Sequence, residues 1–460
     1  MDFPSRRASQ PSRDEAPRVP PTPAPLGAAP GRKSSLLMDF SLLRDNAPFR
    51  TIVIARTLSV LSLGMLTVAV PVQIQDITGS PMQVGMAMAL GGGGAFAGLL
   101  AGGVMADRWD RRNLILLARS LCGLGFVALA VNGFSAAPSV SAMYLLAMWD
   151  GFFSALGVTA LLAATPFLVG RENLAAAGAF NMLTVRVGGI LSPAIGGMVI
   201  ASFGVGWNYV IAAAGALITI AQLVRLPAML PAKREPQHPL RALRDGVGYL
   251  NQNRLVGGVV ALGALVSLGA GVRILLPAFA EDVYRVGPMA VGLMYSAAPL
   301  GATLAALTSG WLGSFRRSGA MLLASGAAAF VALGVLGMVS DPVAAFVALA
   351  GFGYLSSIAS LLQFTLVQRH TPEHLLGRVN GLWAAQAVGG DAFGALALGV
   401  LSRFLPPMPA VLIFSLLALV SSAAMAIGCR SLRAASAEPS DESPSTAKDS
   451  PRTRPAKVGS

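Results

Sequence analysis

Charged side chains inside long apolar runs are the residues of this sequence best placed to do chemistry. Five are of interest: Arg56, Asp150, Arg186, Arg273 and Asp391. A charge in an apolar medium is costly, so such a residue by default pairs with another charge, contacts a polar ligand or carries a proton. We therefore interpret these five residues as candidates for proton coupling or for contact with a substrate.

Asp150 is expected deep in its apolar run, with Ser154 and Gly157 on the same face of a helix. A lone carboxylate cannot face lipid there, so it must face another helix or a water-filled cavity. It is either a structural hydrogen-bond partner for that helix or an acid that binds a proton or a substrate. Arg56 lies about one turn into the first apolar run, where the alternative role is to extend its head group to the membrane surface.

Arg273 and Asp391 bring opposite charges to the second half of the chain. On a continuous helix Arg273 shares a face with Gly269 and Pro277, and Asp391 shares one with Ala395. The two side chains are expected at depths similar enough to pair. Neutralising each other and contacting a substrate are equally good explanations of their presence.

Aromatic rings lie close to some of these charges in the sequence. An acidic, aromatic ligand would be held by arginines together with stacking rings. Arg186 and Arg273 supply charge, and the candidate rings are those of Trp149, Phe152, Phe153 and Trp383. The alternative for each ring is packing against lipid or a neighbouring helix.

Residues that would build an enzyme or a metal site are scattered. The three histidines fall in connections between apolar runs, and the two cysteines lie far apart, at positions 122 and 429. No nucleotide-binding loop is present. We therefore expect no catalysis, no metal and no cofactor, and we expect an ion gradient rather than ATP as the driving force.

The composition indicates which elements must position the charges. Hydrophobic residues make up 54% of the 460 residues and charged residues only 12%, and the mean hydropathy is +0.65. A soluble domain cannot bury so much apolar surface, so the chain is expected to cross a membrane many times. The net charge of +13 is then explained by arginines next to anionic lipid, and no nucleic acid is expected as a partner.

Twelve apolar runs are long enough to span a bilayer. They cover approximately 52–75, 84–106, 113–134, 141–165, 176–202, 207–226, 255–279, 289–312, 319–339, 343–366, 377–402 and 409–429. We predict an N-terminal tail and interfacial segment (1–48), with disorder over 1–35, no signal peptide and a short helix at 36–49. A first bundle (49–226), a polar cytoplasmic linker (227–252), a second bundle (253–429) and a disordered tail (430–460) follow.

Basic residues predict the orientation of the chain. Most of them fall in connections that must share one side of the membrane, whereas the other side has little besides Arg285 and Arg403. Because arginine and lysine favour the cytoplasmic side, we expect both termini in the cytoplasm.

The connection between the second and third runs resembles a loop of the major facilitator superfamily, Gly-x-x-x-Asp-Arg-x-Gly-Arg-Arg. The matching residues are Gly103, Asp107, Arg108, Arg111 and Arg112, and Asp110 replaces the usual glycine. The resemblance implies a gating role for these five residues; an ordinary charged hairpin is the alternative. The short connection also predicts that the helices on either side pack together as antiparallel neighbours, brought close by Gly102 and Gly103.

A second stretch resembles the antiporter motif of the same superfamily. It contains Gly188, Ser192, Pro193, Gly196 and Gly197, with Ser192 in place of a glycine. Physically, it predicts a kinked helix with a face of small residues that packs tightly. The alternative is a bent helix whose small residues serve packing alone.

The chain also repeats itself, since Glu172-Asn173-Leu174 precedes Gly188-Gly189 at the interval at which Glu373-His374-Leu375 precedes Gly389-Gly390. We therefore predict an all-α membrane protein with twelve transmembrane helices in two six-helix pseudo-repeats, the major facilitator fold. Two such halves can rock around a central site.

Several further runs resemble the enterobactin exporters of enteric bacteria, a siderophore-exporting branch of this superfamily. They include residues 68–75, 149–153, 157–166, 169–174, 182–186 and 376–383, and the similarity covers roughly 39–430. The resemblance implies a monomeric inner-membrane exporter of a catecholate siderophore, driven by protons. An exporter of another siderophore, an antibiotic or a hydrophobic drug is the alternative.

Overall fold

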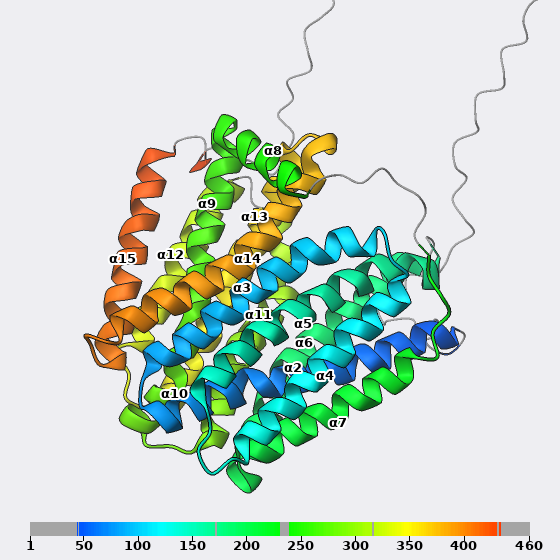
Figure 1. The fold of residues 1–460 in the computed structure, drawn as a ribbon. Coiled ribbons are helices and arrows are strands. Elements are labelled where there is room, and N and C mark those ends of the chain that lie inside the picture. Colours follow the sequence, from blue (N-terminus) through cyan, green and yellow to red (C-terminus); the bar gives the residue numbers. More distant parts are fainter. Residues whose placement is uncertain are drawn as a thin grey trace, which may run out of the picture. The chain divides into compact units, whose positions relative to one another are not determined.

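The computed structural model describes residues 44, 46–170, 173–230, 239–314, 317–429 and 432–433, and these residues form helices and no strand. The contacts discussed below lie within residues 40–460, which form one compact unit (Figure 1). Most of the predicted tails (1–43, 45, 430–431 and 434–460), the loop residues Arg171 and Glu172, residues 231–238 of the predicted linker and residues 315–316 fall outside the described residues.

The first six long helices are α2 (Ala47–Thr78), α3 (Pro81–Ala106), α4 (Arg111–Gly133), α5 (Val140–Val169), α6 (Leu174–Phe203) and α7 (Val205–Leu223). After the amphipathic α8 (Pro239–Gln252), the chain continues with α9 (Arg254–Leu268), a 3₁₀ segment η2 (Gly269–Leu275), α10 (Leu276–Ala278) and a π-helical turn η3 (Phe279–Tyr284). The last elements are α11 (Pro288–Thr308), η4 (Ser309–Ser314), α12 (Ser318–Leu336), α13 (Pro342–His370), α14 (Glu373–Leu401) and α15 (Pro407–Gly428).

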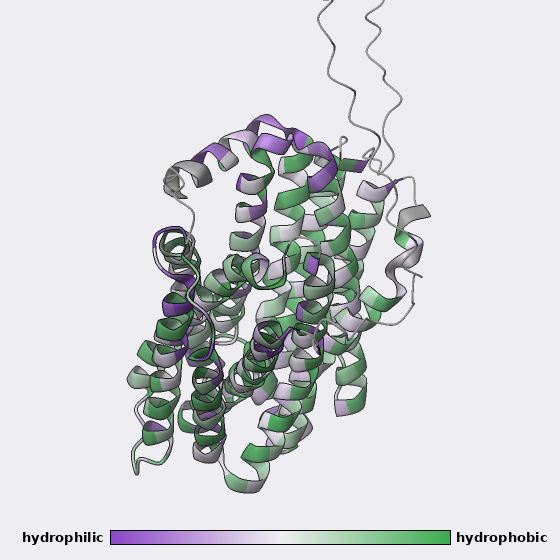
Figure 2. Cartoon of the chain, turned by 90° about the vertical axis from the view of Figure 1, so that its right-hand side faces the viewer, coloured by the Kyte–Doolittle hydropathy of each residue, from purple (hydrophilic) through white to green (hydrophobic). Residues whose placement is uncertain are grey.

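The described residues contain twelve helical segments that are long and apolar enough to cross a membrane, as the sequence predicts. Every boundary lies within five residues of the predicted one. Capping explains part of this agreement, because a short polar side chain that accepts a backbone N–H stabilises the first turn of a helix. Such caps occur at Asn46, Asp110, Ser139, Asn253 and Asp341. The bodies of the helices are largely hydrophobic, and polar residues gather in α8 and the connections (Figure 2).

The packing of the helices repeats between the two halves. In the first half α3 packs along α5, and α4 packs against α5 and α7; in the second half α11 packs along α13, and α12 against α13 and α15. The halves meet where α3 lies beside α14 and where α6 lies beside α11 (Figure 1). This arrangement is that of two six-helix pseudo-repeats.

One predicted neighbour relation is wrong. The helices α3 and α4 follow each other through a short loop but pack mainly on α5 instead of on each other. A β-carbon added at Gly102 would meet Leu156 and Thr159 of α5 at 3.0–3.3 Å, whereas one at Gly103 would meet nothing within 4 Å. The small-residue face of α3 therefore fits α5, and the short loop only fixes the direction of α4.

The seventh span departs from the continuous helix that we predict. Its hydrogen bonding changes from α-helical to 3₁₀ at Gly269 and ends in the π-helical turn η3 at Tyr284. At Gly271 the backbone lies so close to Gly394 of α14 that an added β-carbon would be 2.2 Å from that residue's carbonyl carbon. The irregular segment thus allows a backbone-to-backbone contact with α14, next to Asp391.

The linker is helical where it is described, and α8 is held by the second half. An ion pair of 3.4 Å joins Asp245 of α8 to Arg378 of α14. The hydroxyl of Tyr249 donates to the carbonyl of His370, at the end of α13, at 3.0 Å. The linker therefore adds a polar, amphipathic helix to the ends of α13 and α14.

Candidate transport site

The second half contains the predicted pair of opposite charges, and the structure brings its members together. The guanidinium of Arg273 in η2 donates to the carboxylate of Asp391 in α14. The Tyr295 hydroxyl donates to the carbonyl of Arg273 at 2.8 Å, which fixes the backbone of the irregular segment. The side chains of Arg273 and Asp391 are 33% and 28% exposed. The pair is thus formally neutral and remains accessible.

The first half contains a cluster that includes a residue missed by our sequence reasoning. Arg119 of α4 is only 7% exposed and interacts electrostatically with Asp150 of α5. Cys122, one turn further along α4, interacts with the same carboxylate. One oxygen of Asp150, Oδ1, is buried and has no hydrogen-bond partner among the described residues. Asp150 therefore faces the side of α4 that carries Arg119 and Cys122.

Arg56 of α2 approaches this cluster from a third helix. It interacts electrostatically with Arg119, and its Nε is buried without a hydrogen-bond partner in the described part of the chain. Arg56 is thus a partly buried cation close enough to Arg119 for the two like charges to repel each other. With Asp150 ionised, the three residues carry a net charge of +1.

Arg186 of α6 lies beside the seam between the two halves. Within the described residues it is partly buried and forms neither a hydrogen bond nor an ion pair. On the same helix Ile190 accepts a hydrogen bond from Ser296 of α11 at 2.6 Å, and Gly189 lies against Pro299. Arg186 is one turn beyond these contacts, so it is a cation at the seam without an anionic partner in the described chain.

The motif that resembles an antiporter sequence presents two faces of α6. One face packs on α2 of the same half, because Gly188 meets Val60 and the buried Ser192 fills the space beside Gly64. Gly196 continues this face against α2. The other face carries Pro193 and Gly197 and packs on Gly292 of α11 in the other half. Residues of this one motif therefore contribute both to packing within the first half and to the contact between the two halves.

The candidate aromatic residues form clusters with each other. Trp149 donates its indole N–H to the carbonyl of Leu121 at 2.8 Å and lies 4.7 Å from the ring of Phe153. Phe152 and Phe153 make an edge contact at 5.0 Å, while Trp383 packs on Phe364 at 5.7 Å. These contacts join α5 to α4 and α14 to α13, so the rings have packing partners within each half.

The loop that resembles the gating motif is anchored within the first half. Arg111 stacks on Phe167 at 4.3 Å, and Arg112 donates to the carbonyl of Val224 at 2.6 Å. Asp110, the residue that replaces the usual glycine, accepts hydrogen bonds from the backbone N–H groups of Arg112 and Met229 at 2.9 and 3.0 Å. By contrast, Asp107 and Arg108 are exposed, and Asp107 forms no ion pair with the described residues.

Asp107 and Asp110 therefore differ in their contacts, and replacing them should have different effects. Asp110→Ala should lower the free energy of unfolding by about 1–2 kcal/mol, because it removes a helix cap and a second hydrogen bond. Asp107→Asn should leave the stability and the membrane abundance unchanged and should strongly reduce transport. Thermal unfolding in detergent and efflux at matched abundance measure the two effects. Normal efflux by Asp107→Asn would contradict a gating role for this residue.

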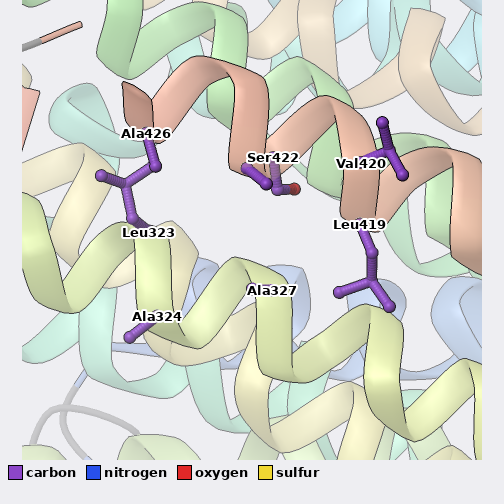
Figure 3. Close-up of a pocket in the computed structure, with 8 residues that line it drawn as sticks. Leu323, Ala324, Ala327, Leu419, Val420, Ser422 and Ala426 are labelled. Carbon is purple, nitrogen blue, oxygen red and sulfur yellow. The ribbon is translucent and has the colours of Figure 1, made fainter. Parts of the chain in front are cut away.

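Two cavities differ in what they could bind. An apolar groove of about 520 Å³ between α12 and α15 is lined by Leu323, Ala324, Ala327, Leu419, Val420, Ser422, Ala423 and Ala426 (Figure 3). Because it offers a single hydroxyl and no charge, the groove does not suit a polar ligand. A cavity of about 10 Å³ in the first half is lined by Ser59, Ser62, Leu63, Arg119, Cys122, Phe126, Ala216 and Thr219. The described residues contain no cluster of three side chains that could hold a metal ion.

Comparison with known proteins identifies the family. The model of the Major Facilitator Superfamily matches residues 52–395. The chain belongs to the major facilitator superfamily. Superfamily members are transporters, and the twelve apolar helices agree with a multi-pass protein of the inner membrane.

The curated relatives within the superfamily are much closer than the solved structures. Enterobactin exporter EntS of Escherichia coli O127:H6 (strain E2348/69 / EPEC) is 50% identical over 376 residues, which are 82% of this chain and 90% of that protein. The same values hold for EntS of Escherichia coli O139:H28 (strain E24377A / ETEC).

The solved structures support the fold alone. The nucleoside transporter NupG aligns with a TM-score of 0.69 at 15% identity, over 83% of this chain and 98% of that one. A bacterial homologue of the human lysosomal transporter Spinster, in an inward-facing and unoccupied conformation, aligns with a TM-score of 0.62 at 15% identity, over 85% and 96%. Both comparisons support the arrangement of helices that the superfamily shares.

Proposed function

We propose that this protein exports a catecholate siderophore, enterobactin or a close relative, across the inner membrane to the periplasm in exchange for protons. The observation that carries the proposal is the 50% identity to enterobactin exporters over 82% of the chain. The 376 aligned residues are too many to lie in the loop motifs alone. The protein would act as a monomer, with both termini in the cytoplasm.

The balance of charge inside the helices supports a substrate that is acidic or rich in hydroxyl groups. Arg273 and Asp391 neutralise each other, whereas the carboxylate of Asp150 interacts with Arg119, and Arg56 faces the like charge of Arg119. Arg186 has no anionic partner in the described chain. A surplus of guanidinium groups attracts phenolic oxygens and repels cationic drugs, since opposite charges attract strongly where water is scarce.

The contacts between the halves support alternating access. On α3 the contacts to α14 lie at Gly85 and Gly92, and on α6 the contacts to α11 lie between Gly189 and Gly197. Gly85 and Gly197 lie toward the helix ends away from the Asp107 loop, whereas Gly92 and Gly189 lie near the middles of α3 and α6. If the Asp107 loop is cytoplasmic, the halves are closed toward the periplasm, and a rocking motion about the seam would open that side.

A deletion strain grown without iron tests the proposal. It should secrete less intact catecholate siderophore than its parent, accumulate the compound or release its fragments, and regain secretion when the gene is restored. Chromatography of the supernatant and of cell extracts measures all three quantities. Resistance to cationic dyes should stay at the parental level.

The opposite result would favour a different exporter. Unchanged siderophore secretion together with new sensitivity to cationic or hydrophobic drugs would show that the protein is a drug pump. Loss of a siderophore that is not a catecholate would keep the protein among siderophore exporters but would change its substrate.

A further inference from the structure

Arg119 is a buried cation whose N–H groups have no hydrogen-bond partner in the described part of the chain. It lies eight residues after the start of α4, and only 7% of its surface is exposed. It belongs to neither of the ion pairs found among the described residues. An arginine keeps its charge in a protein, so a buried one requires an anion or several acceptors beside it. The described side chains supply neither in contact with the guanidinium.

Asp150 of α5 does not fill this role. No ion pair within 4 Å joins it to Arg119. Where the guanidinium reaches α5, it packs over Gly157, at which an added β-carbon would lie 3.5 Å from both Cζ and Nε. Gly157 is two turns away from Asp150. Even with Asp150 ionised, this carboxylate and the two arginines of the cluster, Arg56 and Arg119, carry a net charge of +1, which one further negative charge would cancel.

A small enclosed cavity lies beside the guanidinium of Arg119. Its volume of about 10 Å³ is close to the minimum needed for one water molecule. Three helices of the first half form it: α2 through residues 59, 62 and 63, α4 through 119, 122 and 126, and α7 through 216 and 219. The cavity therefore has room for one water molecule or one monatomic ion and excludes larger anions.

Two serine hydroxyls that line this cavity have no hydrogen-bond partner among the described residues. Ser59 and Ser62 lie one turn apart on α2 and are 6% and 3% exposed. Serines inside helices often donate to a carbonyl one turn back on their own helix, as the buried Ser192 and Ser415 do at 2.6 and 2.7 Å. Ser62 instead extends toward α7, where a β-carbon added at Gly215 would overlap its Oγ. Both hydroxyls can therefore donate into the cavity.

The remaining lining offers few acceptors. The hydroxyl of Thr219 already donates to the carbonyl of Gly215 at 2.8 Å, and Cys122 adds a thiol, which is a weak donor. No carboxylate lines the cavity, and its other walls are hydrocarbon. A water molecule would need acceptors for its two protons, whereas an anion accepts from the guanidinium and from both serines. The donors in this cavity therefore suit an anion better than they suit water.

We infer that this cavity is a chloride site, in which one ion accepts hydrogen bonds from the guanidinium of Arg119 and from the hydroxyls of Ser59 and Ser62. Chloride is monatomic, as the volume requires, and it carries the single negative charge that makes the cluster neutral. The ion would join α2, α4 and α7 and stabilise the packing of the first half. This site goes beyond the proposed function, because it does not depend on which substrate the protein exports.

Binding of radioactive chloride to the purified full-length protein in detergent tests the inference. In sodium gluconate at constant ionic strength, the wild type should bind one chloride per chain, bromide should compete, and sulfate should not. The unfolding temperature should rise by about 1–2 °C for each tenfold increase of chloride above its dissociation constant, since an ion bound only to the folded state stabilises it. In crystals soaked in bromide, an anomalous scattering peak should lie between α2, α4 and α7.

Replacing the donors should weaken binding without disturbing other serines. The double variant Ser59→Ala/Ser62→Ala keeps every charge and should bind chloride about a hundredfold more weakly, roughly tenfold for each hydroxyl removed. Arg119→Gln should abolish binding. Ser415→Ala is the matched control, because Ser415 is a buried serine of a span in the second half whose hydroxyl donates to Val411 of its own helix. It should bind chloride as the wild type does.

Three results would overturn the inference. The first is a wild type that binds no chloride and unfolds at the same temperature in chloride and in gluconate, which would leave water as the occupant of the cavity. The second is equal binding by the wild type and Ser59→Ala/Ser62→Ala, which would place the ion elsewhere. The third is binding by Ser415→Ala that is as weak as that of the serine pair. These measurements decide the question even if Arg119→Gln does not accumulate in the membrane.

Discussion

Replacing Asp150 with asparagine should abolish siderophore uptake into inverted vesicles when a pH gradient is the only driving force. Asparagine keeps the size and polarity of the side chain but cannot take up a proton. Binding of siderophore and its exchange down a concentration gradient should stay measurable, because the other arginines and the seam are unaffected. The gradient-driven rate is therefore expected to fall to that of empty vesicles while exchange persists.

Asp391→Asn is the comparison for this prediction. Asp391 is the other carboxylate within the helices that we assigned to coupling or substrate contact, and it is already neutralised by its ion pair with Arg273. Its replacement should weaken the contact between η2 and α14 and reduce the rate, yet leave the response to pH in place. A preserved response in both asparagine variants would place the proton elsewhere, and loss in Asp391→Asn alone would assign the proton to the second half.

The ends of the helices could be predicted from the sequence, but their partners could not. Span boundaries depend on local information, namely apolar length and capping residues such as Asn46 and Ser139. The partner of α3 depends on which helix offers a surface that fits its small residues, and this surface belongs to α5. A short loop determines the direction of the next helix but does not determine which helices it packs against.

Within the candidate site, the sequence predicted a pair only where two opposite charges lie at similar depths. Arg273 and Asp391 are opposite charges at similar depth, and they pair. Arg119 could have been found by the criterion that selected Arg56, since it too lies several residues inside an apolar run. Its proximity to Arg111 and Arg112 gives it the appearance of a loop residue. Its contact with Gly157 depends on the packing of α4 on α5, which no local pattern contains.

The irregular seventh span could likewise be predicted only in part. Gly269, Gly271 and Pro277 fall within nine residues, and each of them weakens an α-helix. This pattern indicates irregularity without saying which kind of helix forms. The 3₁₀ segment is stabilised by the close contact between Gly271 and Gly394, which belong to elements more than a hundred residues apart.

The contact between the two halves leads to a second prediction of large effect. At Gly197 an added β-carbon would lie 2.7 Å from the carbonyl oxygen of Pro288 and 2.8 Å from Cα of Gly292. These are backbone atoms of α11, which cannot move aside as a flexible side chain can. Gly197→Val should therefore separate α6 from α11 and prevent this side of the transporter from closing.

We expect siderophore transport by Gly197→Val to fall to background while membrane abundance stays near that of the wild type, because Gly197 contacts the other half and the contacts of α6 with α2 remain. Gly178→Val is the matched control, since Gly178 lies on the same helix and a β-carbon there would meet nothing within 4 Å. It makes the same change in helix propensity and should transport normally. Spin labels at Phe203→Cys and Met289→Cys, two exposed positions at the end of α6 and the start of α11, report the geometry. The distribution of distances between them should shift to longer values in Gly197→Val and stay unchanged in Gly178→Val. An unchanged distribution with normal transport in Gly197→Val would show that closure of this seam is not part of the transport cycle.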